Sequence, residues 1–164
     1  MWWVIGGVVA LVLISVYLTW TAARVERLQL RVVAATRALE AHLLRRAAAA
    51  AVLDDERYPF EVYAAARIAL DASDEDREVA ENDLTRQLRA TTLPDEDPQA
   101  QAVIVASRRL AVARQVHTDL VRDALAVRRR PIVRLLRMGR RHPLPTYFDI
   151  DDPTINAPTD LPVP

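Results

Sequence analysis

The chain has 164 residues and no net charge, with 22 basic and 22 acidic side chains. This length fits one modest domain, and three glycines in the whole sequence are too few for a turn-rich β fold. The absence of cysteine excludes disulfides, thiolate metal sites, a cysteine nucleophile and a lipid-modified cysteine. Abundant alanine and arginine without any lysine are typical of a GC-rich bacterial genome.

The first element is an uncharged apolar stretch from Trp2 to Trp20. As a helix it spans about 28 Å, close to the hydrocarbon thickness of a bilayer. Trp2 and Trp3 at one end, with Tyr17 and Trp20 at the other, are typical of the two membrane interfaces. A signal peptide would carry a basic start and a small-residue cleavage site, and this stretch has only a weak version of the second. We therefore predict an uncleaved transmembrane anchor over residues 1–21.

Arginines follow the apolar stretch at Arg24, Arg27 and Arg31, and no basic side chain precedes it. The positive-inside rule therefore predicts a single-pass protein of the cell membrane, with its N-terminus outside and its C-terminal domain in the cytoplasm. Gly6 and Ala10 form a small-xxx-small pair, a candidate surface for packing against another membrane helix. The alternative is that these residues are simply common in membrane helices.

A helical pattern continues beyond the anchor. Apolar positions recur every three or four residues and form one seam (Val25, Leu28, Val32, Ala35, Leu39 and His42). This pattern predicts one helix that runs from the membrane to about residue 55, where three acidic residues and then Tyr58-Pro59 end it. A second helical stretch follows from Phe60 to Leu70.

Ser73 and the acidic residues after it are typical of a helix start, with Ser73 as the N-cap. The sequence leaves open whether the chain breaks there or one helix runs through to about Ala90. The bundle therefore contains either three or four helices. A polar, proline-rich loop follows Ala90.

Asp97-Pro98 predicts an N-cap and the first residue of the last long helix. Its apolar seam is the clearest in the chain (Val103, Ala106, Leu110, Ala113, His117, Leu120, Ala124 and Val127). We predict an all-α fold, in which the transmembrane helix continues into an antiparallel helical bundle over residues 22–141. A Pro/Asp-rich tail over residues 142–164 has no periodicity and is predicted to be disordered or extended.

Charge is distributed in blocks along the chain. The net charge is +4 from Thr21 to Leu53, −9 from Asp54 to Asp97, +9 from Pro98 to His142 and −4 in the tail. We expect these blocks to pair inside one domain, with the acidic segment between the basic ones.

Several segments resemble the LemA family of bacterial single-pass membrane proteins. Arg114-Gln115-(x)3-Asp119-(x)-Val121-Arg122-Asp123 is similar to the late-helix pattern of that family, and Tyr147-Phe148-Asp149 to its closing motif. Ala35-(x)3-Leu39-Glu40-(x)2-Leu43-(x)-Arg45-Arg46 is similar to its early motif, although Thr36 stands where the family has Trp. The resemblance implies an anchor and an antiparallel helical bundle, and it brings no catalytic residues.

The sequence offers no constellation for catalysis, cofactor binding or metal binding, and we predict that the protein is not an enzyme. His42 and His117 fall on apolar seams without a second ligand three or four residues away. We interpret them as packed histidines. No His-Glu-x-x-His, P-loop or dinucleotide glycine pattern is present.

The strongest charged feature is a group of seven arginines near the end of the helical region, our candidate contacts for an anionic partner (Arg128, Arg129, Arg130, Arg134, Arg137, Arg140 and Arg141). The first hypothesis for function is a non-enzymatic interaction protein, a scaffold or accessory subunit of a membrane complex. Its partners would be other membrane proteins, bound through the transmembrane helix and the bundle. The alternative is an anionic-lipid-surface or envelope-stress module that acts through these arginines. No nucleic acid is expected, because aromatic stacking residues are missing nearby.

Overall fold

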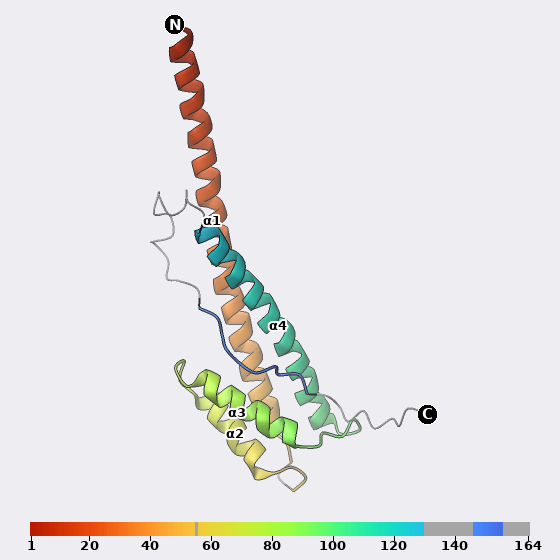
Figure 1. The fold of residues 1–164 in the computed structure, drawn as a ribbon. Helices are drawn as coiled ribbons and strands as arrows, with labels where there is room; N and C mark the ends of the chain where they lie inside the picture. The colour runs from red at the N-terminus through yellow and green to blue at the C-terminus, as the bar shows by residue number, and fades with distance from the viewer. Residues whose placement is uncertain (55, 130–145, 156–164) are drawn as a thin grey trace, which may run out of the picture. The chain divides into compact units, whose positions relative to one another are not determined.

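The computed structural model describes residues 1–54, 56–129 and 146–155. Within these ranges the chain forms four α-helices and no strand (Figure 1). The helices are α1 (Trp2–Ala50), α2 (Phe60–Asp71), α3 (Arg77–Ala90) and α4 (Pro98–Arg128). The predicted all-α fold is therefore confirmed, with four helices where the sequence left three or four open.

Helix α1 begins with the apolar stretch and continues as one unbroken helix to Ala50. By its length and composition, α1 is apolar enough near the N-terminus to cross a membrane. It ends somewhat earlier than the predicted end near residue 55. The chain tightens into a turn there, in which Leu53 N donates to Ala50 O at 3.3 Å and the Leu53 side chain is buried.

The chain divides into two compact units. The first unit comprises Met1–Ala34 and Asp119–Thr146, which contain the start of α1 and the end of α4. Its small core joins these helices through two apolar clusters, one around Val25 and Val127 and the other around Val32, Val121 and Ala124. These pairs run in opposite directions along the two helices, so α1 and α4 are antiparallel in this unit.

The second unit comprises Ala35–Thr118 and Tyr147–Pro164. In it α2 and α3 form a helical hairpin (Figure 1), and their buried faces share one core with the end of α1 and the start of α4. Leu84 and Leu88 of α3 and Val103 and Ile104 of α4 are almost completely buried in this core.

The chain breaks between α2 and α3, which decides the helix count. Ala72 is extended, and residues 74–76 form a turn before α3 begins at Arg77. Ser73 does take part in the start, since Asp76 N donates to Ser73 Oγ at 3.3 Å and Ser73 Oγ donates to Asp76 Oδ2 at 2.8 Å. The regular helix nevertheless begins later than the sequence predicted, because this reciprocal pair closes a turn first.

The predicted seams are the buried faces of both long helices. In α4, Val103, Leu110, His117 and Ala124 are buried, and the intervening seam residues Ala106, Ala113 and Leu120 are partly buried. The α4 cap is also confirmed, because Gln99 N donates to Asp97 Oδ1 at 2.9 Å.

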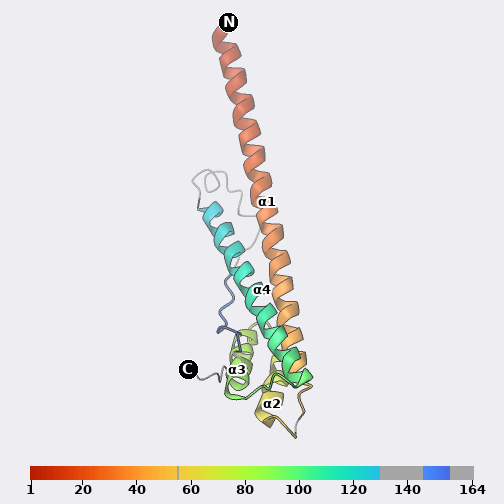
Figure 2. The same cartoon turned by 90° about the vertical axis from the view of Figure 1, so that its right-hand side faces the viewer.

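Residues 147–155, hereafter the C-terminal segment, are extended and pack on the second unit (Figure 2). Ile150 is buried against Leu39, Leu43 and Leu110, and Ile155 enters the larger core. Main-chain groups of this segment bond to α3: Asp149 N donates to Glu78 Oε1 at 3.1 Å, and Asp151 N donates to Asn82 Oδ1 at 2.8 Å. The described part of the tail is thus extended and belongs to the core.

Candidate functional site

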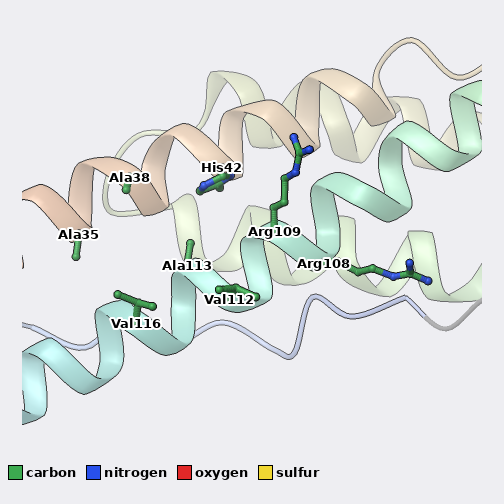
Figure 3. Close-up of a pocket in the computed structure, with 8 residues that line it drawn as sticks. All are labelled: Ala35, Ala38, His42, Arg108, Arg109, Val112, Ala113 and Val116. Atoms are coloured by element: carbon green, nitrogen blue, oxygen red, sulfur yellow. The ribbon is translucent and has the colours of Figure 1, made fainter.

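An open groove lies between α1 and α4 in the second unit and has a volume of about 480 Å³. Ala35, Ala38 and His42 line it from α1, one helical turn apart (Figure 3). Five residues line it from α4: Arg108, Arg109, Val112, Ala113 and Val116. The small alanine side chains leave room between the helices, which is why a hollow forms here.

The groove face is uncovered, whereas the neighbouring face of the same helix pair is covered. Leu39 and Leu110, next to the groove, are buried under Ile150 of the C-terminal segment. On the groove face Val112 and Val116 are 63% and 50% exposed. Two branched apolar side chains side by side at a hollow, with no described residue over them, are typical of an interaction surface.

Positive charge borders this groove. Figure 3 shows Arg109 reaching from α4 toward α1, and Arg108 extending along α4. Both are exposed, and no carboxylate among the described residues pairs with either of them. Between Pro98 and Thr118, helix α4 contains no acidic residue at all. The groove is therefore apolar at its floor and basic at its rim.

The groove provides contact surface and charge, and it holds no pair of carboxylates for acid–base chemistry. His42 is its only imidazole among the lining residues. In the described part of the chain, no group of three or more His, Asp or Glu side chains could hold a metal ion. The arrangement suits binding of an elongated apolar segment that carries negative charge.

A buried ion pair joins α1 to α3, one helical turn of α1 beyond the groove residue His42. Arg46 Nη2 lies 2.5 Å from Glu81 Oε2, and the two side chains are 0% and 1% exposed. Arg46 Nη2 also donates to Thr85 Oγ1 at 3.0 Å. Burial raises the pKa of Glu81, and the neighbouring Arg46 opposes this shift. The other ion pairs of the described residues are local, so the expected pairing between charge blocks is limited to this one contact.

Helix α4 also buries two polar side chains that find no hydrogen-bond partner among the described residues. They are His117, through Nδ1, and Ser107, through Oγ. Burial lowers the pKa of His117, because the charged imidazolium loses its hydration. His117 therefore packs as a neutral side chain of the helix seam.

The structure describes only part of the arginine group that the sequence singled out. Arg128 ends α4 and Arg129 follows it, whereas Arg130, Arg134, Arg137, Arg140 and Arg141 lie outside the described residues. Gly6 and Ala10 are exposed on α1, and nothing lies within 4 Å of a side-chain carbon added at Gly6. These residues belong to the first unit, and the groove belongs to the second.

Sequence reasoning did not find the groove. Its signal was present, because Val105, Val112 and Val116 repeat at seven and four residues outside the main α4 seam. A second apolar stripe on a helix that already has a buried seam indicates a second contact surface. No family model, curated protein or solved structure matches this chain. The resemblance to the LemA family therefore stays a prediction from the sequence.

Proposed function

We propose that this protein is a membrane-anchored, non-enzymatic interaction protein, an accessory or scaffold subunit that binds a partner in the groove between α1 and α4. The observation that carries the proposal is the uncovered apolar floor of this groove, with Val112 and Val116 exposed at its centre. Apolar side chains gathered at a hollow and rimmed by polar residues are a feature of interaction sites.

The basic rim supports a partner that carries negative charge. Arg108 and Arg109 favour a helix that is apolar on one face and acidic along its edge, because such a helix fills the hollow and pairs with both guanidinium groups. A second copy of this chain is a poor occupant. The same groove faces would bring Arg108 and Arg109 against their own copies, and like charges repel.

For the location we propose the cell membrane, with the helical domain in the cytoplasm. The support is the apolar start of α1 and the arginines that follow it, Arg24, Arg27 and Arg31. A reporter fused after Pro164 should then be active only if it is of the kind that works in the cytoplasm. Activity of an exported phosphatase at the same site would contradict this orientation.

Native membranes provide the test of the groove. The full-length chain is purified in a mild detergent, and a photo-reactive amino acid at Ala38, which lines the groove from α1, cross-links whatever occupies the groove. We expect one defined protein of a membrane complex, retained by the wild type and lost from the variants Val112→Asp/Val116→Asp and Arg108→Glu/Arg109→Glu. The exposed position of both valines means that these changes leave the core intact.

The chain offers two matched controls. Val79→Asp changes the same residue type at an exposed position of α3, and Arg128→Glu/Arg129→Glu makes the same change of charge at the end of α4. Both controls should keep the partner. A partner that stays bound to the groove variants would contradict the proposal. A cross-linked product of two copies would assign the groove to self-association, and recovery only as a free monomer would argue against any stable partner.

A further inference from the structure

The end of α4 returns to the part of α1 that directly follows the apolar stretch. Both segments belong to the first unit. Val127 is buried against Val25, with Leu28 packed beside them. With its side-chain oxygen turned toward α4, Gln29 accepts hydrogen bonds from Arg128 Nη2 at 3.0 Å and Nε at 3.1 Å. Apolar packing and polar contacts therefore hold the last turn of α4 at this level of α1.

This level is close to the expected membrane interface. Trp20 ends the apolar stretch, and the guanidinium carbon of Arg24 lies 5.7 Å from the centre of its ring. Val25 follows Trp20 by five residues, a rise of about 7.5 Å along the helix. Because α4 runs antiparallel to α1, Arg129 lies beyond Val127 toward Trp20, within about one Debye length, roughly 8 Å at physiological salt, of the headgroups. Arg128 instead holds Gln29, which follows Trp20 by nine residues, a rise of about 13.5 Å.

Positive charge gathers at this level from both helices. Arg24, Arg27 and Arg31 form an exposed stripe along α1 at spacings of three and four residues, and exposed Arg129 follows the end of α4. The described residues of the first unit carry three acidic side chains, Glu26, Asp119 and Asp123. Asp119 is already paired with Arg122 at 3.1 Å. The stripe and the α4 end are therefore an excess of positive charge close to the bilayer.

We propose that the C-terminal end of α4 binds, through the exposed Arg129, the anionic lipid headgroups of the same membrane that α1 crosses. The helical domain would then contact the bilayer at two points of the sequence, the anchor and the end of α4. Guanidinium groups suit this contact, because they donate two parallel hydrogen bonds to a phosphate. The proposal is independent of any groove partner, and it rests on the start of α1 crossing a bilayer.

The lack of cysteine makes a direct test simple. A single Ala126→Cys substitution at an exposed position near the end of α4 carries the only thiol, to which a fluorophore is attached. The full-length chain is reconstituted into phosphatidylcholine vesicles with or without phosphatidylglycerol, and a nitroxide on the lipid headgroups quenches the fluorophore. We expect stronger quenching with phosphatidylglycerol and a loss of this increment in high salt.

Substitution Arg129→Gln should remove the increment, with about a fivefold loss of headgroup contact. The matched control is Arg108→Gln, which removes equal charge from the groove and should keep the increment. Equal quenching in both vesicle types would overturn the proposal, and so would an equal loss in both variants. A chain that does not float with vesicles would overturn the anchor and this proposal together. None of these results depends on the groove partner.

Discussion

Arg46 of α1 and Glu81 of α3 form an ion pair in which both side chains are buried, with Nη2 and Oε2 2.5 Å apart. Each contributes further polar atoms that find no partner among the described residues: Arg46 Nε and Nη1, and Glu81 Oε1. Taking two charges out of water is costly, and imperfect pairing recovers only part of the cost. The contact therefore specifies how α3 docks on α1 more than it adds to stability.

The first prediction concerns removal of one partner. Glu81→Gln leaves the Arg46 charge buried without a counter-charge, and we expect the free energy of unfolding to fall by roughly 3–5 kcal/mol. Urea denaturation of the full-length chain in detergent, followed by circular dichroism, measures this change. The double variant Arg46→Met/Glu81→Leu removes both charges, and its stability should equal or exceed that of the wild type. Equal losses in the single and double variants would show that the pair itself is the stabilising element.

The second prediction concerns acid sensitivity at His117. Burial lowers its pKa from the ordinary value of 6.5, so the unfolded chain binds a proton at a pH where the folded chain does not. Stability should therefore fall as the pH decreases below about 6.5, by up to roughly 1.4 kcal/mol per pH unit. Urea denaturation at several values between about pH 7.5 and about pH 5 gives the free energy of unfolding at each pH. The change over this range should correspond to the uptake of about one proton on unfolding.

His117→Gln should flatten this dependence between neutral and mildly acidic pH. The same substitution at His42, which lies on the groove, controls for the loss of an imidazole and should leave the acid loss in place. A slope that is unchanged in His117→Gln would assign the acid sensitivity to other groups.

The third prediction concerns the cap of α4. Tyr58 Oη donates a hydrogen bond to Asp97 Oδ2, and burial together with this carboxylate raises the pKa of Tyr58 to about 12. The hydrogen bond from Tyr58 and that from Gln99 N lower the pKa of Asp97. The stability from this lowered pKa is present above the unfolded value near 3.8 and is lost as the pH falls through the folded value.

Tyr58→Phe should lower the melting temperature by roughly 2–6 °C at neutral pH, because one hydrogen bond to a charged acceptor is lost. Asp97→Asn keeps an oxygen that caps α4, and it should make stability less dependent on pH below about 4. The melting temperatures of both variants, measured by thermal denaturation at about pH 7 and about pH 3.5, test these expectations. Equal acid loss in Asp97→Asn and the wild type would contradict this account of the cap.

The fourth prediction concerns the C-terminal segment. Ile150 is 2% exposed among Leu39, Leu43 and Leu110, so Ile150→Ala should cost roughly 2–5 kcal/mol of unfolding free energy. Tyr147 at the start of the same segment is 48% exposed, and Tyr147→Ala should change stability by less than about 0.5 kcal/mol. Urea denaturation compares the two. A similar small effect at both positions would show that the segment is not part of the folded core.

The local sequence pattern was enough to predict the two long helices, whereas it left the break between α2 and α3 open. The apolar stretch at the N-terminus, the seams through Val25 to Leu39 and Val103 to Val127, and the Asp97 cap of α4 are all present in the structure. These features depend on side chains three or four residues apart, or on one turn of backbone. Helical periodicity and capping act over that distance, so the sequence carries them directly.

The contacts that give the molecule its surfaces depend on residues far apart in the sequence. The pairing of Arg46 with Glu81, the burial of Ile150 and the return of Val127 to Val25 each join segments that no local pattern connects. Distant segments also determine that the groove stays open, because Val112 and Val116 are exposed only where no other segment covers them. A sequence period states that a helix has an apolar stripe, and only the packing of distant segments decides which stripe is buried and which is left for a partner.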